Sequence, residues 1–234
     1  MTAETRSIFK HPNWMNGLAF AWIILAFLSI FPVVSLLGAA LPIFHVLWLI
    51  VPLVVLLITR RPASLGIRAI TGPVFLRYAA ANLGLLMLAM LLVEPWSHTY
   101  QALVDLAVGA KTPDVTFAWL ARFPGLPGLA GMLLYSGLVT LFGEELFFRG
   151  WLLQAFLKRM RPVWAIALQA FLFTIPQALA ALFLTPLQGA LYIGVYSFLA
   201  IGCIGGWAAW KTGSIWPSLL SAAVMNLVFV ILFR

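Results

Sequence analysis

Apolar runs separated by charges, prolines and glycines follow one another along most of the chain. Runs of about 17–25 apolar residues are long enough to cross the hydrocarbon core of a bilayer as helices. The pattern therefore predicts an all-α polytopic membrane protein, a bundle of about seven transmembrane helices with a range of six to eight. The predicted spans are residues 17–37, 43–59, 78–93, 129–157, 163–184, 187–210 and 215–233.

Composition supports a membrane protein without a separate soluble domain. Hydrophobic residues make up 64% of the chain and charged residues 9%, against about 45–50% and about 25% in soluble domains. No polar block of domain size interrupts the apolar runs, so residues 1–234 are predicted to form a single transmembrane domain in contact with the lipid bilayer. The net charge of +8 then reflects topology, and no nucleic-acid partner is expected.

The basic residues predict the orientation of the bundle. If the spans alternate, only Lys111, Arg122 and Arg234 fall on one side. The positive-inside rule assigns the opposite, basic side to the cytoplasm. We therefore expect a cytoplasmic amino terminus, an uncleaved first helix and an external carboxyl terminus, and the dibasic inner loops favour a bacterial inner membrane. The residues on the basic side are Arg6, Lys10, Arg60, Arg61, Arg68, Arg77, Lys158, Arg159, Arg161 and Lys211.

One predicted span contains a cluster of charges. Residues 141–150 read LFGEELFFRG, which puts Glu144, Glu145 and Arg149 within a strongly apolar segment. An ionisable side chain at the centre of a bilayer costs about 2.5–3.5 kcal/mol on the insertion scale, so such residues need internal partners and commonly mark function. The cluster predicts a buried polar site.

Spacing separates the roles within this cluster. Glu145 and Arg149 stand four residues apart on one helix face and are predicted to form an ion pair. Glu144 points about 100° away from this pair, where low dielectric and a neighbouring like charge make a carboxylate more basic. Gln177 and Asn226 are predicted to lie in the same layer, because these two and Glu144 are about 17–21 Å from one membrane face at 1.5 Å per residue.

At these residues the sequence resembles a known family. EELFFRG matches the EExxxR signature of the CPBP intramembrane peptidases, the CAAX protease and bacteriocin-processing group, also called Abi. The resemblance extends over residues 130–233, including the GSIWPSLL lead-in to the last span, and marks that region as a peptidase-like core. It implies an intramembrane endopeptidase of the CAAX-protease type that cleaves a membrane-tethered protein or peptide near a hydrophobic or lipidated terminus.

The sequence departs from the family pattern at both later motifs. The family's FxxxH aligns with FTIPQ, so Gln177 stands in place of the histidine. Its HxxxN aligns with AAVMN, so Ala222 replaces the second histidine while Asn226 remains. The chain's histidines lie elsewhere and its single cysteine is Cys203. A zinc site needs three or four N, S or carboxylate ligands, so neither zinc nor another cofactor is predicted.

A peptidase mechanism without metal is the favoured interpretation. Glu144 is predicted to act as general base for water, with the amides of Gln177 and Asn226 as donors to the oxyanion. Arg149 is predicted to hold Glu145 ionised, and that charge keeps Glu144 basic. The predicted catalytic set is thus Glu144, Glu145, Arg149, Gln177 and Asn226.

Two other interpretations are open at this stage. Loss of both histidines is also expected of an inactive pseudopeptidase that serves as a membrane binding or scaffold protein. The ion pair alone is also explained as a lock for helix packing, although this leaves Glu144 without a role. A transporter or channel is disfavoured, because the first three predicted spans carry almost no ionisable residues.

Overall fold

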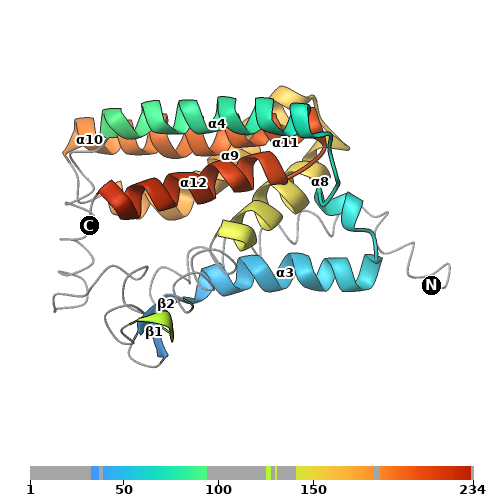
Figure 1. Cartoon of the computed structure of the whole chain (residues 1–234), viewed down its shortest axis with the longest axis horizontal. Helices are drawn as coiled ribbons and strands as arrows, with labels where there is room; N and C mark the ends of the chain where they lie inside the picture. Colours follow the sequence, from blue (N-terminus) through green and yellow to red (C-terminus); the bar gives the residue numbers. More distant parts are fainter. Residues whose placement is uncertain are drawn as a thin grey trace.

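A computed structural model describes residues 33–36, 39–93, 125–127, 130, 141–181 and 185–232. In these residues a short antiparallel hairpin precedes a bundle of apolar helices (Figure 1). The bundle contains two longer helices that are each continuous across several named elements, η4 with α8 and α10 with η5 and α11. The elements are β1 (Val33–Leu36), β2 (Ala39–Pro42), α3 (Ile43–Thr59), η1 (Pro62–Leu65), α4 (Gly72–Val93), η4 (Glu145–Leu152), α8 (Leu153–Leu157), α9 (Pro162–Ala181), α10 (Pro186–Ala190), η5 (Leu191–Ile204), α11 (Gly205–Thr212) and α12 (Trp216–Leu232).

The described helices follow the predicted spans closely. Helix α3 has the bounds predicted from the apolar run 43–59, and α8 ends at Leu157 as predicted. Helix α4 begins at Gly72, six residues before the predicted start at 78, because the basic Arg77 is accommodated on an exposed helix face. Within the described residues, two helices are long and apolar enough to cross a membrane, Gly72–Ala89 and Pro186–Thr212. The predicted total of about seven spans is not established by these two.

The hairpin corrects the end of the first predicted span. Residues 33–36 form β1, which pairs antiparallel with β2 in the register Val33↔Pro42, so this stretch is not helical. Short apolar runs rich in β-branched residues fit a strand as well as a helix, and periodicity does not separate the two. The remainder of that span, residues 17–32, lies outside the described residues.

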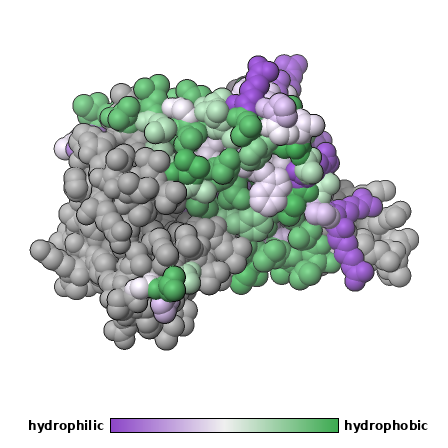
Figure 2. Space-filling model, viewed as in Figure 1, coloured by the Kyte–Doolittle hydropathy of each residue, from purple (hydrophilic) through white to green (hydrophobic). Residues whose placement is uncertain are grey.

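Basic side chains gather at one end of the bundle. The α3–α4 connection, the end of α8 and the α11–α12 turn all lie at the right-hand end of Figure 1, and hydrophilic surface is concentrated there in Figure 2. The arrangement agrees with the shared side predicted from the sequence, since helices that alternate in direction bring these connections together. The exposed basic residues are Arg60, Arg61, Arg68, Arg77, Lys158, Arg159, Arg161 and Lys211.

The sides of the bundle are apolar instead. Leu57, Leu91 and Val163 are 75%, 76% and 72% exposed on three different helices. Exposed apolar surface of this extent is typical of contact with lipid or with a partner. Combined with the basic end, it is the distribution expected of a bundle inserted in a bilayer.

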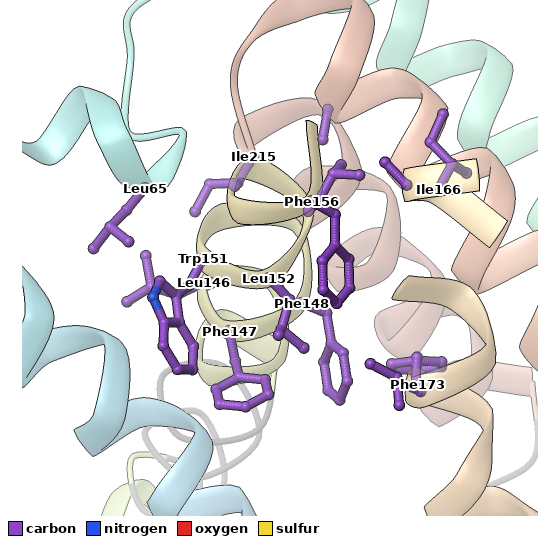
Figure 3. Close-up of a cluster of buried hydrophobic side chains, with 14 of the residues drawn as sticks. Leu65, Leu146, Phe147, Phe148, Trp151, Leu152, Phe156, Ile166, Phe173 and Ile215 are labelled. Atoms are coloured by element: carbon purple, nitrogen blue, oxygen red, sulfur yellow. The ribbon is translucent and has the colours of Figure 1, made fainter. Parts of the chain in front are cut away.

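Helix η4 lies at the centre of the core. Its aromatic side chains contact α3 on one side and α9 on the other (Figure 3), with ring centroids 5.0 Å apart for Trp48 and Phe148 and 5.1 Å apart for Phe148 and Phe173. Gly150 allows η1 to approach, because a Cβ there would lie 2.5 Å from the carbonyl oxygen of Leu65. This packing fixes the helix that carries the charged cluster.

Candidate active site

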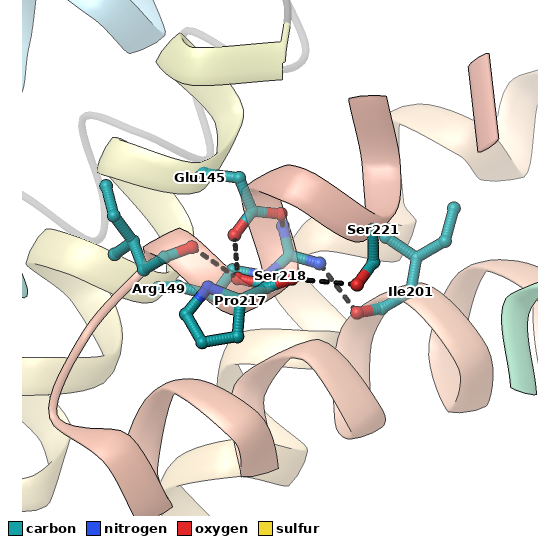
Figure 4. A network of polar contacts seen from close by, with 7 residues as sticks. Glu145, Arg149, Ile201, Pro217, Ser218 and Ser221 are labelled. Carbon is teal, nitrogen blue, oxygen red and sulfur yellow. Dashed lines mark hydrogen bonds and ion pairs between the residues drawn. The ribbon is translucent and has the colours of Figure 1, made fainter. Parts of the chain in front are cut away.

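The predicted ion pair is present in η4. Arg149 Nη1 lies 3.4 Å from Glu145 Oε1, and both side chains are buried (Figure 4). Ser218 in α12 donates a hydrogen bond of 2.5 Å to the other carboxylate oxygen, Oε2. Its hydroxyl also contacts the carbonyl oxygen of Ile215 at 3.0 Å. Glu145 therefore has a partner on each oxygen, one from its own helix and one from α12.

The guanidinium of Arg149 links three helices. Its Nη2 donates to the carbonyl oxygen of Ile201 in η5 at 2.6 Å, and its Cζ lies 4.8 Å from the ring centroid of Phe173 in α9. A Cβ at Gly205 would lie 3.3 Å from both Nε and Nη2, so a glycine is needed where α11 begins. Removing one partner of such a buried, hydrogen-bonded pair costs about 3–5 kcal/mol, which makes this cluster a packing element in its own right.

A cavity of about 240 Å³ opens beside the ion pair. It brings together polar groups from α4, η4, α9, η5 and α12, while Leu86, Leu141 and Met225 are among its apolar walls. Glu144, half-buried, borders this cavity with Glu145 and Arg149. The polar residues that line it are Asn82, Glu144, Glu145, Arg149, Gln177, Tyr192, Tyr196, Ser197 and Ser218.

Gln177 is held by a tyrosine from the neighbouring helix. Tyr192 in η5 donates its hydroxyl to Gln177 Oε1 at 2.5 Å. Tyr192 is buried and stacks on Tyr196, with ring centroids 6.0 Å apart. Since the amide oxygen of Gln177 is engaged as an acceptor, its Nε2 group is the part of the amide that remains to donate.

The structure brings four of the five predicted site residues together and leaves one undescribed. Glu144, Glu145, Arg149 and Gln177 all line the cavity. Asn226 belongs to α12, but its side chain lies outside the described residues. Ala222, which stands where the family pattern has a histidine, lines the cavity one helical turn before Asn226. The catalytic roles of these residues stay predictions.

Sequence reasoning missed several polar residues that complete this site. Asn82, Tyr192, Tyr196 and Ser197 line the cavity, yet in the sequence they are scattered polar residues within predicted apolar spans. Ser218 lies in the GSIWPSLL segment, which resembles the family but did not predict a role for this serine in the site. A lone polar side chain at membrane depth was the available signal, because such a group is expected to face the bundle interior.

The donor set does not fit a zinc site. Within the described residues, no three His, Cys, Asp or Glu side chains gather closely enough to hold a metal ion. The cavity offers two carboxylates and the two amides of Asn82 and Gln177, and the carboxylate of Glu145 is already engaged by Arg149 and Ser218. Structural and catalytic zinc sites use three or four protein ligands of the N, S or carboxylate type. The described residues therefore supply no set of three close ligands for zinc.

A bundle of apolar helices around a buried glutamate–arginine pair and a polar cavity defines a class, the membrane proteins with an intramembrane polar site. Residues 126–228 match the family model described as type II CAAX prenyl endopeptidase Rce1-like. This match confirms the resemblance to the CPBP family that EELFFRG indicated. It covers η4 and the cavity walls from α9, η5 and α12, whereas α4 precedes it. No curated protein and no solved structure significantly matches the chain.

Proposed function

We propose that the chain is an intramembrane peptidase that cleaves a membrane-tethered protein or peptide near its terminus, by glutamate chemistry that needs no metal ion. One observation carries the proposal: Glu144 borders the same cavity as Gln177, whose amide oxygen is engaged by Tyr192. A carboxylate and an amide donor that border one cavity are the groups that peptide hydrolysis requires. We further propose a bacterial inner membrane with the basic end of the bundle in the cytoplasm.

The chemistry uses one water molecule. Glu144 accepts a proton as the water oxygen attacks the scissile carbonyl carbon, and the carbonyl π electrons move onto its oxygen. Gln177 Nε2 donates to that oxyanion. When the tetrahedral intermediate collapses, the C–N bond breaks and Glu144 returns the proton to the leaving nitrogen. The products are a carboxylic acid and an amine, and Glu144 ends as it began.

The neighbouring cluster of Glu145, Arg149 and Ser218 supports this chemistry without exchanging protons or bonds with the substrate. Glu145 is paired with Arg149 and Ser218, so its carboxyl group is fixed in position. The cluster also anchors η4 to η5 and α12, which keeps the two sides of the cavity at a constant separation.

The decisive experiment is cleavage by purified protein in detergent or vesicles. The probes are labelled peptides with a prenylated cysteine near the carboxyl terminus and labelled apolar peptides without it, each followed by mass spectrometry in water enriched in ¹⁸O. We expect one solvent oxygen in the new carboxylate and no cleavage by Glu144→Gln. Equal cleavage by the parent and Glu144→Gln would assign the products to a contaminating peptidase and refute the proposal.

A pseudopeptidase is the second candidate, and a specific observation favours it. Gln177 and Ala222 occupy the positions of the family's two histidines, and both line the cavity. On this alternative the cavity binds a membrane partner without cleaving it. A peptide that binds the parent protein and is recovered intact after long incubation would support this alternative over the enzyme.

A further inference from the structure

Two buried polar groups of the cavity play no part in the proposed chemistry. Asn82 in α4 is 2% exposed and Ser197 in η5 is 1% exposed, and both line the cavity. Asn82 Oδ1 and Ser197 Oγ have no hydrogen-bond partner among the described residues. Asn82 also precedes the segment that matches the family model, so no family motif accounts for it.

Unpaired groups of this kind are costly in an apolar bundle. A buried polar atom without a partner typically costs about 1–3 kcal/mol. The neighbouring Ser221 illustrates the usual solution, because its hydroxyl is within 2.9 Å of the carbonyl oxygen of Ala79, one turn before Asn82. Two unpaired groups that line one cavity therefore indicate a bound molecule with a complementary donor and acceptor.

A peptide backbone supplies this complement. Each peptide group carries one N–H donor and one carbonyl acceptor. A peptide bond can be hydrolysed inside a membrane only where its segment is unwound, and the freed backbone groups then need partners within the protein, since lipid offers none. Glu144 and Gln177 border the same cavity, so a backbone bound at Asn82 and Ser197 lies next to them.

We propose that Asn82 and Ser197 bind the substrate backbone beside the scissile bond. Asn82 Oδ1 accepts a peptide N–H, and Ser197 Oγ donates to a peptide carbonyl oxygen. Both are positioning residues, and the assignment rests on the proposed peptidase function. Such bonds recognise no side chain, so they hold many sequences in one geometry and leave selectivity to the rest of the cavity.

The test is a binding measurement with cleavage switched off. In a Glu144→Gln background, a fluorescent peptide with a prenylated cysteine near its carboxyl terminus is titrated into Asn82→Leu, Ser197→Ala and the unaltered cavity. One hydrogen bond corresponds to a loss of affinity of about 2–10-fold in each variant. The matched control is Gln169→Met, because Gln169 is a fully buried amide with both polar atoms unpaired that packs against Gly206 and does not line the cavity. Its affinity should be unchanged.

Modified peptides make the assignment specific. N-methylation of one backbone amide should weaken binding to the unaltered cavity and have no further effect in Asn82→Leu, since the same hydrogen bond is then already lost. If Asn82→Leu fails to fold, the binding of the N-methylated peptides still tests the proposal, because their affinity can be measured for the unaltered cavity and for Ser197→Ala. With the catalytic glutamate restored, Asn82→Leu should raise KM with little change in kcat.

The outcomes separate this proposal from the proposed function. Three results would each overturn the proposal that Asn82 and Ser197 bind a peptide backbone. They are undiminished affinity in both cavity variants, the absence of any position sensitive to N-methylation, and no binding of any probe. Water would then be the occupant of the site. Cleavage by the parent protein would still support the peptidase in the first two cases. Peptide binding that depends on Asn82 without any cleavage would instead support the backbone site and refute the enzyme.

Discussion

Two polar regions lie side by side in this bundle and differ in how their groups are partnered. In the cluster of Glu145, Arg149 and Ser218, the carboxylate is engaged on both oxygens by η4 and α12. In the adjoining cavity, Asn82 Oδ1 and Ser197 Oγ are buried without partners among the described residues. The carboxylate of the first region is satisfied within the protein, whereas the two groups of the second region are those that we propose a bound substrate completes. The difference separates polar groups that hold the fold together from polar groups that are left without a partner inside the protein.

The two adjacent glutamates give the sharpest test of this comparison. Glu144→Gln keeps size and hydrogen-bonding capacity and removes the general base, so the cleavage rate should fall by about 10²–10⁴-fold while the protein stays folded. Glu145→Gln should instead lower thermal stability, because Arg149 loses its charged partner. Single-turnover rates and melting temperatures of both variants check this. A stable, inactive Glu145→Gln beside an active Glu144→Gln would reverse the two roles.

Arg149→Ala tests the structural side of the comparison. It leaves Glu145 buried with only Ser218 as partner, and losing one member of a buried pair typically costs about 3–5 kcal/mol. We expect low yield and a lowered melting temperature, with partial recovery when Glu145→Gln is added. Arg159→Ala, at an exposed position, is the control and should stay within about 0.5 kcal/mol of the parent. An Arg149→Ala protein as stable as the parent would show that the pair does not hold the bundle.

Substitutions at Gln177 and Tyr192 test the role of the cavity, and their expected effects on the cleavage rate are smaller. Gln177→Ala removes the proposed oxyanion donor and should lower kcat by about 10²–10³-fold. Tyr192→Phe removes only the hydroxyl that engages the Gln177 amide, so a loss of about tenfold or less is expected. The controls are Gln154→Ala on α8 and Tyr78→Phe, whose ring contacts Trp207. Equal cleavage rates for Gln177→Ala and Gln154→Ala would show that Gln177 serves helix packing and is not an oxyanion donor.

The same comparison explains what the sequence could predict. Helix α3 and the end of α8 follow from local properties, the length of an apolar run and the charges that end it. The Glu145–Arg149 pair is also local, because its partners are four residues apart. The strand at residues 33–36 was mistaken for the end of a helix, since a short apolar run fits either structure.

The cavity depends on contacts that no local pattern encodes. Tyr192 reaches Gln177 across 15 residues, and Ser218 reaches Glu145 across 73. Asn82 joins the site only because α4 packs against η5 and α12. Depth along the spans did predict a shared layer for Glu144 and Gln177, but helix rotation decides which neighbours enter it. A single asparagine or tyrosine in an apolar span gives no indication of its partner. The sequence therefore could not assign such residues to the cavity.

Metal removal is the test with the smallest expected effect. The family pattern has histidines where this chain has Gln177 and Ala222, and the carboxylate of Glu145 is engaged by Arg149 and Ser218. A carboxylate and amides alone make a weak zinc site. We therefore expect less than one zinc per chain by elemental analysis, and unchanged cleavage after dialysis against a strong chelator. Replacing Gln177 by His should then raise zinc affinity, because it restores one imidazole beside Glu144. A tightly held metal in the parent, or activity that vanishes with chelator and returns with added zinc, would mean that ligands beyond the described residues complete the site.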